Sequence, residues 1–172
     1  MIRILTPNDA ESYQNLRLLS LKTDPLAFLS TYDVETKYDI SYFRQKIFNS
    51  TKSPNYGIYG YLNIRNLMAF AQLADSFYNN KRHITYLNEV YVHPDYRRKR
   101  IATKLVEYLV NKAKESLLLE QLHLRVNSGN ISAISFYEKL GFNKIAVLKD
   151  SVKNPDNTYQ DEYFYCLYLK NH

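Results

Sequence analysis

Apolar positions along the chain change their spacing repeatedly, and this pattern predicts alternating helices and strands. Apolar residues three or four positions apart indicate a helix that is buried on one side, whereas short apolar or alternating runs between turn residues indicate strands. Helices are predicted at residues 10–22, within 31–48, at 101–118 and at 132–140. Strands are predicted at residues 2–4, 55–63, 67–75, 84–92, 121–126, 142–149 and 162–169.

The order of these elements predicts a mixed α/β (α+β) fold. Strands that follow one another across a turn, such as 55–63 and 67–75, should form antiparallel hairpins. Helix 101–118 separates strands 84–92 and 121–126, so these two strands should be parallel and joined by a right-handed crossover. We therefore expect a single domain over residues 1–172, with a mostly antiparallel central sheet, one parallel βαβ crossover and helices on both faces.

Helix 101–118 carries the most regular apolar stripe, and Gly141 is expected to end the helix at 132–140. Because the opposite side of helix 101–118 is rich in lysine, only one of its sides should pack on the sheet. The predicted buried stripe consists of Ile101, Leu105, Leu109, Ala113 and Leu117.

Composition narrows the class of protein. The chain is 45% hydrophobic and 23% charged, as in ordinary globular proteins, and it has 17 tyrosines but no tryptophan. Its single cysteine, Cys166, cannot form an intrachain disulfide, and no Cys/His cluster has metal-ligand spacing, so we expect no metal site. Apolar runs fall short of the ~20 residues that span a bilayer, and no signal segment is recognisable. These features predict a cytoplasmic protein with no membrane association.

The net charge of +6 favours an anionic partner, and the basic residues cluster at 97–100. This cluster stands in a turn between strand 84–92 and helix 101–118, where the first N–H groups of the helix have no acceptor within the helix. The turn is therefore suited to bind an anion such as the pyrophosphate of a coenzyme. On this stretch alone, a solvated basic turn or a nucleic-acid patch would explain the charges equally well.

Two motifs resemble those of the GNAT N-acetyltransferase superfamily. Residues 87–94 (LNEVYVHP) and 97–102 (RRKRIA) are similar to the family's central strand followed by its Q/R-x-x-G-x-G/A turn. Residues 130–142 (NISAISFYEKLGF) are similar to a second signature later in the family's chain. The two motifs occur in the family's order across one βαβ unit, which makes the signal specific. The strong resemblance covers about residues 84–142, and the flanks agree only in topology.

The resemblance implies acetyl-CoA as co-substrate and a primary amine as acceptor. The acetyl group would pass directly to a small cationic amine or to a protein N-terminus, with no metal ion and no nucleic acid. The pantetheine arm would pair with the main chain of the central strand, and the pyrophosphate would bind mainly to backbone N–H groups. The implied cofactor-binding residues are Val90, Tyr91, Val92, Arg97, Arg98, Lys99, Arg100, Ile101, Ala102, Thr103, Asn130 and Tyr137.

One position departs from the family pattern, because Arg100 stands where the first glycine is usual. If the backbone there requires a positive φ, a residue other than glycine costs about 1–2 kcal/mol. If the backbone is already right-handed helical, Arg100 costs nothing and can contact a phosphate. We expect the second case.

Glu89 and Tyr137 are the predicted catalytic residues. Tyr137 occupies the family's general-acid position, where a hydrogen bond to the developing thiolate is favoured over early proton transfer, which would be uphill by about 2 kcal/mol. Glu89 is the candidate base, although an outward-facing glutamate in an ion pair explains it equally well. Asn130 would lie near the pantetheine, with a helix N-cap as its structural alternative.

The acceptor side is less defined by the sequence. Segment 26–48 and the last hairpin usually wall the acceptor pocket of this fold, and aromatic side chains with carboxylates suit a cationic amine. The candidate wall residues are Phe28, Tyr32, Glu35, Tyr38, Asp161 and Tyr163. A non-catalytic acyl-CoA-binding module of the same fold is the main alternative function, and a homodimer is one candidate for the oligomeric state.

Overall fold

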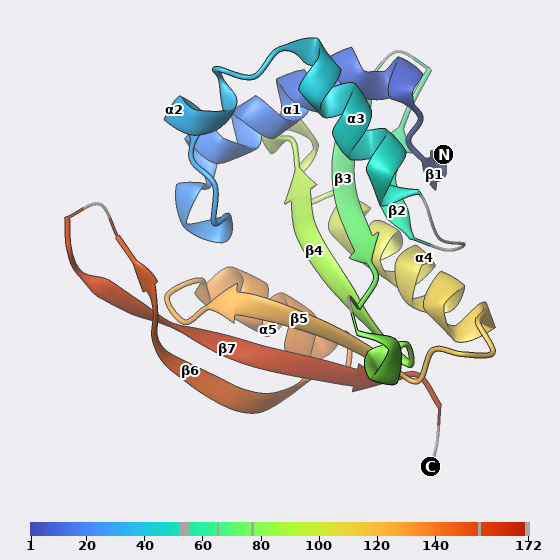
Figure 1. Ribbon diagram of the computed structural model, residues 1–172, viewed down its shortest axis with the longest axis vertical. Coiled ribbons are helices and arrows are strands. Elements are labelled where there is room, and N and C mark those ends of the chain that lie inside the picture. Colours follow the sequence, from blue (N-terminus) through green and yellow to red (C-terminus); the bar gives the residue numbers. More distant parts are fainter. Residues whose placement is uncertain (52–55, 65, 77, 155, 171–172) are drawn as a thin grey trace.

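The computed structural model describes residues 1–51, 56–64, 66–76, 78–154 and 156–170. Within these residues, one sheet has the strand order β1-β2-β3-β4-β5-β7-β6 (Figure 1). The strands are β1 (Ile2–Ile4), β2 (Gly57–Leu62), β3 (Leu67–Ala74), β4 (Ile84–Val92), β5 (Gln121–Asn127), β6 (Asn143–Lys153) and β7 (Tyr159–Tyr168). The helices are α1 (Ala10–Thr23), α2 (Tyr32–Glu35), α3 (Ile40–Ser50), α4 (Ile101–Glu115) and α5 (Ile131–Lys139), with short 3-10 turns η1 (Pro7–Asp9), η2 (Pro25–Ala27), η3 (Asn79–Lys81) and η4 (Pro94–Tyr96).

The predicted mixed topology is confirmed. Neighbouring strands pair antiparallel except β4 and β5, which are parallel and are joined through α4. A crossover helix is needed between these two strands because the chain must return to the same end of the sheet before β5 begins. The predicted hairpins β2–β3 and β6–β7 are both present.

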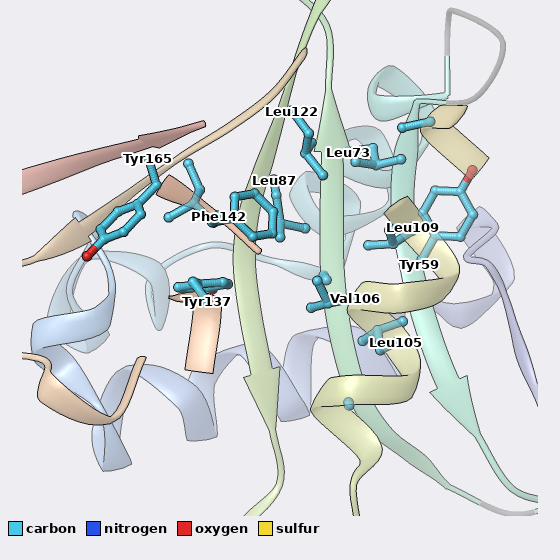
Figure 2. Close-up of a cluster of buried hydrophobic side chains, with 14 of the residues drawn as sticks. Tyr59, Leu73, Leu87, Leu105, Val106, Leu109, Leu122, Tyr137, Phe142 and Tyr165 are labelled. Atoms are coloured by element: carbon cyan, nitrogen blue, oxygen red, sulfur yellow. The ribbon is translucent and has the colours of Figure 1, made fainter. Parts of the chain in front are cut away.

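Helices cover both faces of the sheet, as predicted (Figure 1). On one face, α1 and α3 bury Tyr13 and Phe43 against Phe70 of β3 and Tyr91 of β4. On the other face, the apolar stripe of α4 packs on β3 and β4, and Tyr137 of α5 packs with Phe142 and Tyr165. Figure 2 shows Leu105, Val106 and Leu109 of α4 directed toward Leu73 and Leu87 of the sheet.

Most boundaries match the predictions, and the differences have local causes. Gly141 follows α5 with a φ of 88°, the left-handed conformation expected where a helix ends. Segment 31–48 forms two helices, and Asp39 begins the second by accepting hydrogen bonds from the backbone N–H groups of Ser41 and Tyr42. The predicted strand start at Asn55 lies outside the described residues.

The assignment of Leu117 to the buried stripe of α4 is wrong. The helix ends at Glu115, and Ser116 takes an extended conformation that carries the chain toward β5. Leu117 is therefore 92% exposed, and Leu119 is buried instead. No helix in the described part of the chain combines the length and the apolar character needed to cross a bilayer.

The burial of α4 generates a stability prediction. Leu105 is fully buried, so Leu105→Ala should lower the free energy of unfolding by about 2–5 kcal/mol in urea titrations, because the lost side chain leaves a cavity. Leu117→Ala is the matched control, and it should change that free energy by less than about 0.5 kcal/mol. Equal effects of the two substitutions would contradict the packing described here.

Candidate active site

The sheet opens between β4 and β5. These strands pair only through Ile84, Thr85 and Tyr86 of β4, whereas β5 continues to pair with β7 as far as Asn127. Beyond Tyr86 the two strands diverge (Figure 1), so residues 87–92 of β4 have no neighbouring strand on that edge among the described residues. An unpaired strand edge offers main-chain donors and acceptors to any extended molecule that lies along it.

A β-bulge lies on the open part of β4. Phe70 and Gln72 of β3 pair with Tyr91 and Asn88, so two residues of β4, Glu89 and Val90, stand opposite the single Ala71. Glu89 has a φ of 56°, a left-handed conformation that costs a non-glycine residue about 1 kcal/mol or more. Bulges re-aim side chains. Here the side chain of Glu89 reaches α1 and α3, while Val90 packs against the core on the opposite face.

The Glu89 carboxylate is surrounded by donors. The Tyr13 hydroxyl donates to Oε2 at 3.0 Å, and Lys46 Nζ lies 2.9 Å from Oε1 and 3.2 Å from Oε2. Arg17 Nη2 lies 3.6 Å from Oε1. Glu89 is therefore in an ion pair, as the structural alternative predicted. It does not point outward, however, because its side chain is only 20% exposed and faces the helices.

Burial raises the pKa of the Tyr13 hydroxyl, and the nearby Glu89 carboxylate raises it further. Tyr13 therefore remains protonated and acts as a hydrogen-bond donor to Glu89 at neutral pH. Its ring is fixed by edge contacts with Phe43 and Phe70. The orientation of the carboxylate thus depends on the packing of α1 and α3 over the sheet.

A second, fully buried ion pair lies beside Glu89. Arg17 of α1 donates to Glu35 of α2 through Nε at 2.9 Å and Nη2 at 2.6 Å, and both residues are at most 3% exposed. Burial acts to raise the pKa of Glu35, but the hydrogen bond and charge of Arg17 outweigh it, and the pKa lies below its ordinary 4.5. Arg17 Nη1 has no hydrogen-bond partner among the described residues.

This pair changes the predicted role of Glu35. The sequence places Glu35 on the wall of the acceptor pocket, but its carboxylate is taken up by Arg17 and shielded from solvent. Phe28 covers the Arg17 guanidinium, with 4.7 Å between its ring centre and Cζ. Glu35 and Phe28 therefore hold Arg17 in place and do not line the surface of an acceptor pocket.

The other candidate wall residues also have partners within the protein. Tyr38 stacks on Tyr42 at the surface, and Asp161 pairs with Lys149 across the β6–β7 hairpin. Lysine ammonium groups lie 4.1 Å from the ring centres of both Tyr32 and Tyr163. Both rings are therefore engaged by lysines of the protein itself, and their part in an acceptor wall stays a prediction.

Three residues of the charged cluster around Glu89, namely Tyr13, Arg17 and Lys46, were missed from the sequence. Arg17 carries a signal, since it interrupts the apolar run of Leu16, Leu18 and Leu19, and a charge within such a run needs a buried partner. Lys46 has no comparable signal, because its contact with Glu89 depends on how α3 crosses the sheet.

The turn before α4 exposes a row of main-chain donors. The first intrahelical acceptor is the carbonyl of Arg100, which receives the N–H of Lys104. None of the consecutive N–H groups from Arg98 to Thr103 has an acceptor within the described part of the chain. Free donors at a helix N-terminus, together with the helix dipole, form a site for an anion.

The expectation that Arg100 is right-handed is wrong. Arg100 has a φ of 59° and Arg98 a φ of 61°, so both lie in the left-handed region. The turn must bring the chain from β4 into α4 within a few residues, which requires these conformations. Arg100 therefore carries the strain that a glycine would avoid.

The basic side chains of the turn differ in whether they already have a hydrogen-bond partner within the protein. Arg97 donates to Asp24 at 2.6 Å and to the Val92 carbonyl at 3.1 Å, and Lys99 donates to the Asp95 carbonyl at 2.9 Å. Arg98 and Arg100 are exposed and have no such partner among the described residues. These two side chains are therefore the ones free to approach an anion at the start of α4.

Asn130 and Tyr137 lie at the two ends of one helix, α5. Tyr137 is 9% exposed, and its ring contacts Phe136 and Phe142 edge-on. Burial raises the pKa of its hydroxyl above the ordinary value of 10.0, which makes loss of its proton more difficult. Asn130 caps α5, since its Oδ1 accepts from the Ala133 N–H at 3.1 Å. This is the structural alternative that the sequence predicted for Asn130.

The described part of the chain contains no group of three or more His, Cys, Asp or Glu side chains that could hold a metal ion. Cys166 is 1% exposed, and burial raises its thiol pKa, so it is a core thiol.

The strain at Arg100 is testable by glycine substitution. Arg100→Gly should raise the free energy of unfolding by about 0.5–1 kcal/mol, because glycine adopts the left-handed conformation without a steric penalty. Lys104→Gly, one turn into α4, should lower the same free energy by about 1 kcal/mol, since glycine is unfavourable within a helix. Urea titrations that gave both changes the same sign would contradict the left-handed assignment.

The buried Arg17–Glu35 pair predicts a large loss of stability when one partner loses its charge. Glu35→Gln should lower the free energy of unfolding by about 3–5 kcal/mol at neutral pH, because the buried Arg17 loses its bidentate partner and keeps only the Glu89 oxygen 3.6 Å away. Glu11→Gln, at an exposed position of α1, is the control and should change it by less than about 0.5 kcal/mol.

The same pair predicts a pH dependence. The pKa of Glu35 in the folded state lies below 4.5, so its stabilising contribution is complete above that pH and is lost as the pH falls through the lowered pKa. The free energy of unfolding of the wild type should therefore fall more steeply below pH 4.5 than that of Glu35→Gln. Parallel curves would show that the pair contributes nothing.

Comparison with known proteins agrees with this geometry. The profile of the acetyltransferase (GNAT) family matches residues 20–142. An N-alpha-acetyltransferase of the archaeon Saccharolobus solfataricus is 40% identical over 65 residues, and this stretch covers 38% of the chain and 39% of the archaeal protein.

Solved structures share the fold at lower identity. A ribosomal-protein-alanine N-acetyltransferase from Brucella melitensis superposes with a TM-score of 0.84 at 20% identity, over 98% of this chain and 99% of that one. The protein yncA from Salmonella typhimurium, solved with its cofactor acetyl-CoA, gives a TM-score of 0.80 at 18% identity, over 100% and 95% of the two chains. The family match spans both the open edge of β4 and the start of α4, and the chain belongs to the GNAT acetyltransferase family.

Proposed function

We propose that this protein transfers the acetyl group of acetyl-CoA to a primary amine, which attacks the thioester directly. The observation that carries the proposal is the position of two sets of unpaired main-chain groups. The open edge of β4 leads, through η4 and the basic turn, to the free N–H groups at the start of α4. An extended molecule with an anionic end fits this arrangement, and acetyl-CoA is such a molecule.

The chain's own residues suit each part of this co-substrate. The N–H groups from Arg98 to Thr103 would bind the pyrophosphate, with the side chains of Arg98 and Arg100 adding charge. The main chain of Val90, Tyr91 and Val92 would pair with the amides of the pantetheine arm. An N–H of this edge would also polarise the thioester carbonyl and stabilise the oxyanion that forms during attack.

Glu89 is proposed as the base. The attacking amine becomes acidic as it bonds to the carbonyl carbon, and a carboxylate within hydrogen-bond reach can then take its proton. The bulge aims Glu89 toward the acceptor face, and Tyr13 holds one of its oxygens. The carboxylate is partly exposed, so an amine or a bridging water can reach it.

Tyr137 is proposed to assist departure of the thiolate. Because burial raises the pKa of its hydroxyl, complete proton transfer to a thiolate is unfavourable, and a hydrogen bond to the developing negative charge is the better role. The described residues provide no hydrogen-bond partner for this hydroxyl, which leaves it available to the sulfur.

The acceptor is proposed to be the α-amino group of a protein N-terminus or a small cationic amine. The name of the archaeal relative, N-alpha-acetyltransferase, favours the first of these. Exposed apolar side chains in and around η2 and α2, namely Leu26, Leu29 and Val34, lie beside the proposed acceptor side and would suit a peptide better than a polyamine.

The proposal is tested by thiol release from acetyl-CoA with a panel of amines. The panel contains a peptide with a free N-terminus, the same peptide blocked at its N-terminus but carrying lysine, spermidine, glucosamine and a free amino acid. At least one amine should release thiol, and Glu89→Gln should lower kcat for it by roughly 10²- to 10⁴-fold, as expected for loss of a general base. Tyr137→Phe should lower kcat by roughly 10- to 100-fold, the effect of one hydrogen bond to a charged group.

Calorimetric titration with acetyl-CoA separates binding from chemistry. Both variants and the control Glu11→Gln should bind acetyl-CoA as the wild type does, and Glu11→Gln should keep its kcat. Absence of binding at high micromolar concentration would refute the proposal. Binding without thiol release for any amine would instead favour a non-catalytic acyl-CoA-binding module, which the strained Arg100 and the engaged carboxylate of Glu89 make the second candidate.

A further inference from the structure

We infer that Lys46 is itself an acetylation site, modified by the acetyl-CoA that the same chain binds. The inference rests on the proposed function and adds an intramolecular acceptor to it. It starts from the contact between Lys46 Nζ and Glu89, which places a primary amine of the protein at the carboxylate proposed to activate primary amines.

The contact has the geometry that catalysis requires. A general base must lie about 2.6–3.2 Å from the atom whose proton it takes. Lys46 Nζ lies 2.9 Å from one carboxylate oxygen of Glu89 and 3.2 Å from the other. An external amine that Glu89 activates directly would occupy this same position, so Lys46 stands where the acceptor nitrogen belongs.

The lysine is held in this position by its surroundings. Lys46 lies on α3 next to Ile47, which is fully buried, and Phe43 anchors the preceding turn. Its side chain is 20% exposed, and its ammonium lies 5.7 Å from the centre of the Tyr13 ring. A reacting group held in place reacts as if at a very high local concentration, which favours Lys46 over the freely moving lysines of the surface.

There is space for the product. A solvent-open hollow of about 400 Å³ adjoins Lys46 and is otherwise lined by polar side chains and one tyrosine. Its lining residues are Tyr42, Gln45, Lys46, Asn49, Ser50 and Gln72. An acetylated side chain is neutral and can leave Glu89 for this hollow, where amide and hydroxyl groups can bind its carbonyl and N–H.

The step balances without a further reagent. Lys46 Nζ forms a bond to the acetyl carbonyl carbon, the carbon–sulfur bond breaks, and CoA leaves as its thiolate with Tyr137 donating a hydrogen bond to the sulfur. The ammonium first loses one proton to solvent, and the neutral amine loses a second proton to Glu89 as the new carbon–nitrogen bond forms. The product is Nε-acetyl-Lys46 and free CoA. Glu89 then keeps the Tyr13 hydroxyl and the nearby Arg17 but loses its contact with an ammonium group.

The test uses the full-length protein, trideuteroacetyl-CoA and no added amine, followed by digestion and mass spectrometry. The heavy acetyl group distinguishes new modification from any that arose during expression. Lys46 should gain the label at least tenfold faster than Lys104, an exposed lysine of α4 that serves as the internal reference. Glu89→Gln should slow labelling of Lys46 at least tenfold and leave labelling of Lys104 unchanged.

A second readout is the unfolding temperature of the modified protein, which is measured without acetyl-CoA. After acetyl-CoA has been removed, labelled wild-type protein should unfold at a lower temperature than unlabelled protein, because an ion pair is lost. Lys46→Arg keeps the ion pair and cannot be acetylated at this position, so prior incubation with acetyl-CoA should leave its unfolding temperature unchanged.

Calorimetry and labelling together distinguish failure of self-acetylation from failure of the proposed function. If calorimetry shows binding of acetyl-CoA but Lys46 is labelled no faster than Lys104, the self-acetylation proposal is overturned and the proposed function is untouched. Self-acetylation through Glu89 is likewise overturned if Glu89→Gln leaves the labelling rate of Lys46 unchanged. If acetyl-CoA does not bind at all, both proposals fail together.

Discussion

The site depends on main-chain hydrogen-bonding groups that the fold leaves unpaired. Backbone N–H and C=O groups are nearly always satisfied within a protein, so two adjacent sets without a strand or helix partner need an explanation. One set lies on β4, where β5 diverges after Tyr86, and the other lies at the start of α4. The proposed function supplies an explanation, because an extended anionic molecule could provide partners for both sets.

The rest of the domain keeps these groups in position. Packing of the α4 stripe against β3 and β4 fixes the first turn of the helix relative to the open strand edge (Figure 2). Pairing of β5 with β7 draws β5 away from β4. The left-handed conformations of Arg98 and Arg100 are needed because so few residues connect strand and helix. Strain at this turn is therefore compensated by burial elsewhere.

Charge is distributed differently on the two sides of the open strand. On the side of the α4 turn, exposed cations surround free donors, which suits a phosphate. On the side of α1 and α3, each buried charge has a counter-charge, since Arg17 pairs with Glu35 and Lys46 pairs with Glu89. The Lys46–Glu89 pair is the more exposed of the two, so its carboxylate is the one that can exchange partners. The buried pair connects α1 and α2 and supports the orientation of Glu89.

The sequence by itself determined the fold class and the order of the elements, and it located the turn with free N–H groups that we propose as the anion site. These follow from local signals: the spacing of apolar residues in α4, the glycine that ends α5, and two motifs that bracket one crossover. Such signals need no knowledge of distant contacts, because helix periodicity and turn chemistry are properties of neighbouring residues.

Only the tertiary structure decided the conformation of Arg100, the bulge at Glu89 and the partners of its carboxylate. Arginine does not favour positive φ, so its left-handed conformation arises from the fixed positions of β4 and α4. The bulge appears only when the registers on both sides of Ala71 are compared. Lys46 and Glu89 are far apart in the chain, and the crossing of α3 over the sheet brings them together. Sequence periodicity does not encode that crossing, because it depends on how the side chains of three elements pack.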